Sequence, residues 1–216
     1  MSARAHESYG QSGLTWVDRF GVWLSHRAIL RWLPQRDSLA VLDLGCGYHA
    51  TQLMRLCDPL GPRGMRCIHK AVGVDFEISP ELKTIPKDLL DLTFYEGPIE
   101  EILPKLERGA FDVVLLNSVL EHLHQPLAAI ESAHALLRPG GVLLINVPTW
   151  RGKWFLELSA FRLGLSPKVE MDDHKMYYDQ RDLWPLLVRA GFRPSQLHLH
   201  THKFGLNLFA AATKDA

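Results

Sequence analysis

The chain has 216 residues, enough for one domain with a sizeable hydrophobic core. Its 24 basic and 24 acidic residues balance, so the net charge predicts no nucleic-acid-binding surface and favours a small-molecule ligand. The three cysteines are not spaced like a disulfide framework, which predicts free thiols in a reducing, cytoplasmic environment. No uncharged apolar stretch approaches a bilayer-spanning length, so stable membrane insertion is not expected.

The first predicted element is an amphipathic helix over Leu14–Leu33, with tryptophan and phenylalanine at helical spacing. We interpret residues 1–36 as a helical lid over the substrate. Packing on the core, or contact with a membrane or a lipid-linked substrate, are the alternative uses of such an aromatic stripe. After a break at Pro34–Ser38, the apolar run Leu39–Leu44 predicts a buried strand that ends in a glycine turn.

The change from apolar strand to amphipathic helix then recurs along the chain. Further strands are predicted at Ala71–Asp75, Leu92–Tyr95, Phe111–Leu116 and Gly141–Val147, with helices at Ala50–Leu56, Ile99–Leu106 and Pro126–Leu137. Strands that alternate with helices form a parallel sheet covered on both faces. A last helix at Arg181–Ala190 precedes two closely linked strands, Gln196–Thr201 and Leu206–Ala211, which predict an antiparallel hairpin. The prediction is one doubly wound α/β domain over residues 1–216, with a seven-stranded, mostly parallel sheet.

Residues 149–176 are too many for a simple connection after the fifth strand, and their aromatic side chains recur at helical spacing. We interpret this segment as a helical insertion that caps the substrate. His174 and Tyr177 lie at its end, in a charged and aromatic stretch that could contact a substrate or be a solvated loop.

The turn after the first strand, Gly45-Cys46-Gly47, satisfies a loose dinucleotide-binding pattern that ends at Ala50. Asp43 separates the possible ligands, because a carboxylate beside this turn would repel a pyrophosphate but attract a cation. S-adenosylmethionine carries an ammonium and a sulfonium group, so it suits Asp43 better than a dinucleotide does.

With these residues the chain resembles the class I S-adenosylmethionine-dependent methyltransferases, in the branch that acts on small molecules. Four segments carry the resemblance in the order that the family has them: Asp43–Gly47, Gly73–Asp75, Phe111–Leu123 and Leu136–Gly141. The resemblance implies a Rossmann-like methyltransferase fold, S-adenosyl-L-methionine as cofactor and S-adenosyl-L-homocysteine as product.

The resemblance also assigns the cofactor-binding residues: Asp43, Gly45, Cys46, Gly47, Asp75, Phe76, Pro98, Ile99 and Asn117. In the family the acid at Asp75 accepts hydrogen bonds from both ribose hydroxyls, which suits a carboxylate, and Phe76 would lie against the adenine. The chain departs from the family at Pro98, where an aspartate is common, and at His49, where many members have a third glycine.

Methyl transfer from a sulfonium depends mainly on the alignment of the acceptor, and a hydroxyl acceptor gains from a general base. The candidate catalytic residues are His122, His174 and Tyr177, with His124 as a further histidine close by. Glu121 is interpreted as structural or solvated. His198, His200 and His202 share one strand face, but no carboxylate accompanies them locally, so no metal site is predicted and a solvated face is expected.

The expected activity is methyl transfer to a hydroxyl of a small molecule such as a sugar, a phenol or quinone, or a secondary metabolite. Nitrogen and carbon acceptors remain alternatives. So do a dinucleotide-dependent oxidoreductase and a pseudoenzyme that binds the cofactor and serves as an interaction partner.

Overall fold

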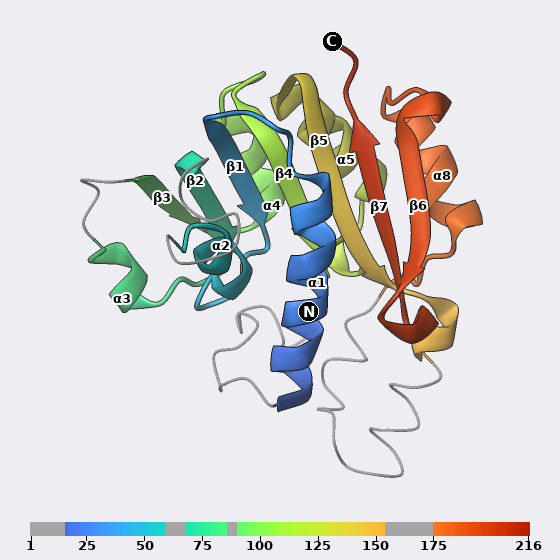
Figure 1. Cartoon of the computed structure of the whole chain (residues 1–216), viewed down its shortest axis with the longest axis horizontal. Coiled ribbons are helices and arrows are strands. Elements are labelled where there is room, and N and C mark those ends of the chain that lie inside the picture. Colours follow the sequence, from blue (N-terminus) through green and yellow to red (C-terminus); the bar gives the residue numbers. More distant parts are fainter. Residues whose placement is uncertain (1–15, 59–67, 86–89, 154–174) are drawn as a thin grey trace.

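A single seven-stranded sheet forms the centre of the computed structural model, which describes residues 16–58, 68–85, 90–153 and 175–216 (Figure 1). The strands are β1 (Leu39–Leu44), β2 (Ile68–Asp75), β3 (Asp91–Glu96), β4 (Phe111–Asn117), β5 (Leu137–Pro148), β6 (Leu197–His202) and β7 (Asn207–Thr213). Their order in the sheet is β3-β2-β1-β4-β5-β7-β6. Only β7 runs antiparallel to its neighbours, so the predicted doubly wound sheet with a closing hairpin is confirmed.

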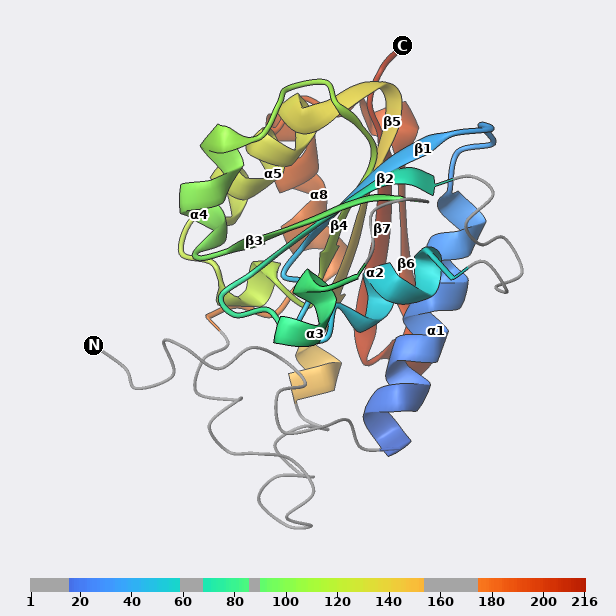
Figure 2. The ribbon, with the colours of Figure 1, turned by 90° about the vertical axis from the view of Figure 1, so that its left-hand side faces the viewer.

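Helices cover both faces of the sheet (Figure 2). The described helices are α1 (Trp16–Trp32), α2 (Thr51–Leu56), α3 (Pro80–Lys83), α4 (Ile99–Ile102), α5 (Pro126–Leu136) and α8 (Gln180–Arg189). Short 3-10 turns are η1 (Leu103–Lys105), η2 (Leu120–His122), η3 (Pro194–Gln196) and η4 (Lys203–Gly205). Figure 2 shows α4, α5 and α8 on one side of the sheet and α1 and α2 on the other. No described helix is both long and apolar enough to cross a bilayer.

The core has two halves because side chains of a strand alternate between its faces. Leu42 and Leu44 of β1 join the apolar cluster that also includes residues of α4, α5 and α8. Leu39 and Val41 join a second cluster, which includes Ala28 and Ile29 of α1. Every residue of β1 is buried, as expected for a central parallel strand with both faces covered.

The amino-terminal edge of the sheet is held by a fully buried carboxylate. The Asp112 side chain accepts hydrogen bonds from the backbone N–H of Ala40 and from the Arg36 guanidinium, both at 2.7 Å. It also forms an ion pair with Arg138 at 3.1 Å. These contacts join β1, β4 and β5 at the edge where the parallel strands β1 and β4 begin.

The structure differs from several of the sequence-based boundaries, and β2 for example begins at Ile68 rather than Ala71. The fifth strand starts at Leu137 rather than Gly141, because Leu137 already pairs with Phe111 and a register shift accommodates the residues between. The helix predicted over Ile99–Leu106 is a short α-helix followed by the 3-10 turn η1, which contains Pro104, a residue without a backbone N–H. Helix α3 was not predicted, since its four residues are too few to show a hydrophobic period.

Helix α1 lies over the sheet with one half and extends past the carboxyl-terminal edge with the other (Figure 1). In the inner half Ser25, Ala28 and Ile29 are buried, while Trp16 and Phe20 in the outer half are 79% and 45% exposed. Residues 1–15 of the predicted lid and residues 154–174 of the predicted insertion lie outside the described residues. Residues 150–153, where the predicted insertion begins, are helical.

Candidate functional site

The turn after β1 has a backbone shape that requires glycine. Gly45 and Gly47 have φ angles of +74° and +79°, in the left-handed region that side chains disfavour. A Cβ atom on Gly45 would lie 2.3 Å from Cγ2 of Val119, so there is no room for a larger residue. The backbone N–H groups of Gly45 and Cys46 both donate to the carbonyl of Val74, which fixes the turn against β2.

Asp43 is a buried carboxylate directly before this turn. Both of its oxygens are shielded from solvent and have no hydrogen-bond partner among the described residues. Burial, together with the nearby charge of Asp75, raises the pKa of Asp43 to about 8. A buried carboxylate without a partner is costly, so a cation bound over the turn would stabilise it. Because its oxygens are covered, Asp43 would act through its charge rather than by direct contact.

Asp75, at the end of β2, links the second strand to the glycine turn. Its Oδ2 accepts a hydrogen bond from the N–H of Gly47 at 2.7 Å, and its Oδ1 accepts one from the N–H of Phe76 at 2.8 Å. A carboxylate oxygen has two lone pairs, so each oxygen can accept a further hydrogen bond from a ligand hydroxyl. The ring of Phe76 is half exposed and is available to a flat ligand beside Asp75.

The loop after β3 is attached to the same place, since the N–H of Gly97 donates to the backbone carbonyl of Asp75 at 2.9 Å. Pro98 is half-buried at the start of α4, and Ile99 is buried. The N–H groups of Glu101 and Ile102 donate to the Pro98 carbonyl. Pro98 and Ile99 therefore follow directly on the loop that is bonded to Asp75, and neither side chain can donate or accept a hydrogen bond.

Cys46 lies in the glycine turn, but its thiol is not placed for nucleophilic chemistry. The side chain is buried, and burial raises the pKa of the thiol well above its usual value, so it stays protonated. Its Sγ packs 3.0 Å from the point where Gly73 would carry a Cβ atom, and the Phe94 ring lies closer still. Cys46 thus helps to pack the turn against β2.

At the end of β4 an asparagine pair links β4 to β5. Asn117 Oδ1 accepts a hydrogen bond from Asn146 Nδ2 at 2.9 Å, and the two residues are neighbours in β4 and β5. Asn146 is buried, and its own Oδ1 has no partner among the described residues. Sequence reasoning found Asn117 through the methyltransferase motif but missed Asn146. The available signal was an amide within the otherwise apolar run Gly141–Val147.

The candidate catalytic residues follow β4 and β5 at the carboxyl-terminal edge of the sheet. His122 is half-buried at the end of η2, and its backbone carbonyl accepts a hydrogen bond from Lys175 Nζ. The Lys175 N–H donates to the carbonyl of Glu121 at 2.7 Å. The segment that begins at Lys175 therefore lies against η2. Tyr177 is two residues further along this segment, so the chain at Tyr177 lies near the chain at His122. His174 lies outside the described residues.

The rings around Tyr177 close one side of this region. Tyr177 is buried, with its ring centroid 5.6 Å from that of Trp150, and Lys153 Nζ lies 5.9 Å from the Tyr177 centroid. The neighbouring Tyr178 donates its hydroxyl to the Leu120 carbonyl, and burial raises its pKa to about 12. Glu121 is buried, so the interpretation of it as a solvated residue is wrong.

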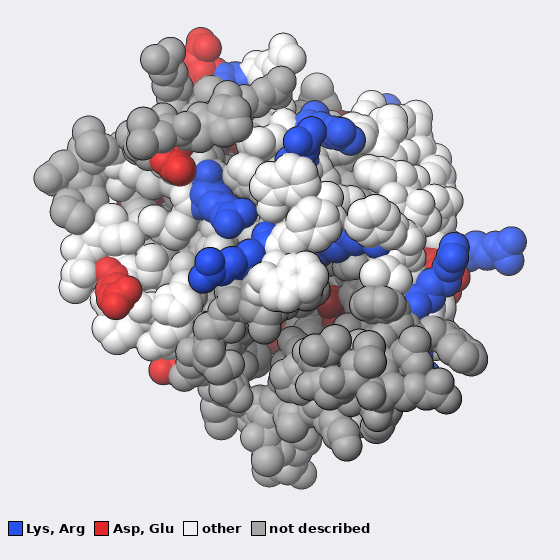
Figure 3. All heavy atoms as spheres, turned by 60° about the horizontal axis from the view of Figure 1, so that its bottom comes forward, with Lys and Arg blue, Asp and Glu red and all other residues white. Residues whose placement is uncertain are grey.

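The histidines of β6 are not arranged as a metal site. No group of three metal-binding side chains occurs among the residues that the structure describes. His198 and His200 are exposed, in agreement with the expected solvated face, but His202 is half-buried against Phe209. Figure 3 shows the carboxyl-terminal edge, where Lys and Arg side chains lie among uncharged ones.

Comparisons with known proteins agree with this geometry. A family described as "Methyltransferase domain" matches residues 17–197. A ubiquinone biosynthesis O-methyltransferase of Acinetobacter baumannii (strain AYE) is 26% identical over 157 residues, which are 68% of this chain and 62% of that protein. The chain spans between 43% and 62% of the length of the first curated relatives that it matches.

Two solved structures share the fold. A methyltransferase from Haloferax volcanii, solved in complex with the activator Trm112, superimposes with a TM-score of 0.66 at 15% identity, covering 92% of both chains. The 1,6-didemethyltoxoflavin-N1-methyltransferase of Burkholderia thailandensis, solved with S-adenosylhomocysteine, gives 0.62 at 21% identity, covering 93% of this chain and 81% of that one.

A doubly wound sheet with a glycine turn at β1 and an acidic residue at the end of β2 defines a nucleoside-binding α/β protein. Together with the family match over residues 17–197, this places the chain in the class I S-adenosylmethionine-dependent methyltransferases.

Proposed function

We propose that this chain transfers the methyl group of S-adenosylmethionine to a hydroxyl group of a small molecule, in a reducing cytoplasmic compartment. The single observation that carries the proposal is the glycine turn at Gly45–Gly47 with Asp75 bonded to it and Asp43 buried beneath it. These residues offer a cation-stabilising charge and a hydroxyl acceptor within one turn, which suits a nucleoside that carries a positive charge.

Each part of the cofactor has residues that suit it. We assign the ribose hydroxyls to Asp75 and the adenine to Phe76, Pro98 and Ile99, where the surface is apolar. The amino-acid end lies over Gly45, Cys46 and Gly47, with Asn117 beside it. Because proline stands at Pro98 in place of an aspartate, adenine would be recognised by packing alone. His49 stands in place of a third glycine, and the next residue, Ala50, adopts a left-handed conformation with φ of 44°.

When bound, the cofactor supplies an electrophilic methyl group on a sulfonium with a good leaving group. The work of the chain is then to hold the acceptor oxygen in line with that methyl group and to exclude water. We assign His122 as the general base that accepts the proton of the acceptor hydroxyl. His174 and Tyr177 are the other candidates for this role. Residues 1–36 and 149–176 would close over the acceptor.

The choice of a hydroxyl acceptor rests on the name of the Acinetobacter relative, which is an O-methyltransferase of ubiquinone biosynthesis. That relative supports a phenol-type acceptor, and the balanced charge of this chain favours a small molecule over a nucleic acid. Nitrogen and carbon nucleophiles are the alternatives that an acceptor panel would reveal.

The test is calorimetry with S-adenosylmethionine and S-adenosylhomocysteine on the folded chain, followed by transfer of labelled methyl groups to phenols, sugars and amines. We expect micromolar binding, on the order of −8 kcal/mol, and product with phenols. No heat with millimolar cofactor would overturn the proposal, and binding of NADH instead would favour an oxidoreductase. Binding without transfer to any acceptor would favour the pseudoenzyme.

A further inference from the structure

Helix α1 contacts strand β6 at one end and the following turn η4 at the other, and a hollow lies between these two contacts. At one end the Trp32 and His198 rings have centroids 4.8 Å apart. At the other end Lys203 Nζ lies 3.7 Å from the point where Gly21 would carry a Cβ atom. Between these contacts lies an open hollow of about 360 Å³ on the surface, lined by Ala28, Arg31, Trp32 and His200. This volume is in the range of cavities that take small organic ligands.

The charges around this hollow are of one sign. Partial loss of solvent around the ring, and then the nearby Arg31, lower the pKa of His200, whose residue as a whole is exposed. Burial lowers the pKa of His202 to about 4, with Lys203, His200 and Arg31 adding to the effect. No acidic residue contributes to either pKa, and His198 is the remaining titratable group on this face of β6. No ion pair or hydrogen bond of Arg31 occurs among the residues that the structure describes.

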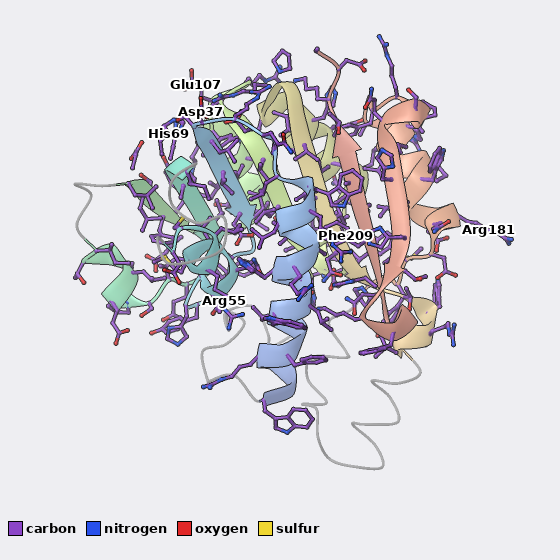
Figure 4. The ribbon with its side chains drawn as sticks, in the orientation of Figure 1. Asp37, Arg55, His69, Glu107, Arg181 and Phe209 are labelled. Carbon is purple, nitrogen blue, oxygen red and sulfur yellow. The ribbon has the colours of Figure 1, made fainter. Side chains whose placement is uncertain are left out.

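The chemistry of the lining selects a ligand class. A guanidinium binds phosphate or carboxylate oxygens through paired N–H donors, and a bound anion would also stabilise the positive form of His200. The Trp32 indole offers a flat apolar face beside Arg31 on which a ring can stack. Beneath the histidines lies the buried ring of Phe209, 5.4 Å from His200 between centroids, which keeps this side of the hollow apolar (Figure 4).

We propose that this hollow, which we call the α1–β6 groove, binds a small aromatic molecule bearing a phosphate or carboxylate group. The groove is separate from the cofactor turn, since β4, β5 and β7 lie between β1 and β6 in the sheet. Because His200 binds the anion best when protonated, affinity rises as the pH falls through the pKa of His200. Arg31, Lys203, His198 and His202 are the other basic groups on this side.

The experiment follows the imidazole C2 protons of the full chain by NMR during titration with phenyl phosphate, benzoate and inorganic phosphate, with S-adenosylhomocysteine held at saturation. We expect saturable shifts of the His200 signal and a rise in its pKa. Phenyl phosphate or benzoate should bind more tightly than inorganic phosphate, because only they have a ring for Trp32. His134, which lies on α5 at the opposite face of the sheet, is the internal control and should not move.

Two arginine variants distinguish binding in the groove from nonspecific attraction of the anion to positive charge. Arg31→Gln should weaken phenyl phosphate binding about tenfold or more, the scale for one charge-assisted contact. Arg27→Gln is the matched control, because Arg27 is an exposed arginine one turn earlier whose guanidinium lies over Trp23 instead. Equal losses in both variants, unsaturable shifts of all histidines, or shifts of His200 that appear only when S-adenosylhomocysteine is left out would each overturn the proposal. A stronger response to benzoate would identify a carboxylate as the natural group.

Discussion

At the scale of single residues, the buried Asp43 has a consequence for stability that can be measured. Its pKa is raised to about 8, so between pH 4 and 8 the folded chain holds a proton that the unfolded chain has released. The stability contributed by this proton is complete below the unfolded pKa and is lost as the pH rises through 8. Asp43→Asn removes this loss because the amide does not ionise.

The difference in unfolding free energy between Asp43→Asn and the natural chain should grow in favour of the variant by on the order of 2 to 4 kcal/mol as the pH is raised from 5 to 8.5. Urea unfolding at several pH values measures the difference, in which all other titrating groups cancel. Saturating S-adenosylmethionine should reduce the gain, because its positive charge stabilises the Asp43 carboxylate. Parallel pH profiles for the two proteins would contradict the assignment.

Asp75 is the second residue with a direct test. Asp75→Ala should weaken S-adenosylmethionine binding by about 2 to 3 kcal/mol, the scale for hydrogen bonds to a charged group. The variant also loses the bonds to the N–H groups of Gly47 and Phe76, so a smaller loss of stability should accompany the effect. Calorimetry measures the affinity, with Asp91→Ala at the exposed start of β3 as control. Unchanged affinity would mean that the ribose lies elsewhere.

At the scale of elements, the outer half of α1 has an exposed aromatic face at the edge where the acceptor would enter. The Phe20 and Trp23 rings stack with centroids 5.7 Å apart, and Trp23 is 43% exposed. A lid that closes over the acceptor would use such a face to exclude water. The buried inner half keeps the helix on the sheet, so changes in the outer half should leave the fold intact.

If α1 is a lid, Trp23→Ala should lower kcat/KM for the acceptor about tenfold or more while the affinity for S-adenosylmethionine stays within about twofold. Trp184→Ala on α8 is the matched control, a tryptophan of similar exposure (38%) whose helix covers the other face of the sheet. Hydrogen exchange should show protection of the outer half of α1 only when cofactor and acceptor are both present. Full protection in the free protein would make α1 a fixed part of the core.

At the scale of the whole molecule, Asp112 joins three strands at the edge opposite the site. Asp112→Ala leaves the N–H of Ala40 buried without an acceptor and two arginines without their anion. We expect a loss of about 2 to 4 kcal/mol in unfolding free energy. Cofactor affinity at a temperature where the variant stays folded should not change. Urea unfolding measures the loss against Asp91→Ala, and equal stabilities would show that Asp112 is dispensable.

The sequence by itself determined the order of strands and helices along the chain and the glycine turn after β1. A strand or helix shows itself through the period of its own side chains, and the turn is a run of consecutive residues. Asp43, Gly45 and Gly47 could therefore be read directly, and the antiparallel hairpin followed from the short link between its strands. Helix α3 was missed because its four residues are too few to show a hydrophobic period.

Only the tertiary structure decided which distant residues meet. Val119 closes on Gly45 and Asn146 pairs with Asn117 because β4 lies between β1 and β5 in the sheet. Arg31 and His200 line one groove because α1 crosses the sheet on the face where β6 presents its histidines. These contacts depend on the strand order and on how the helices pack, and both are set by burial of the whole core rather than by any local pattern.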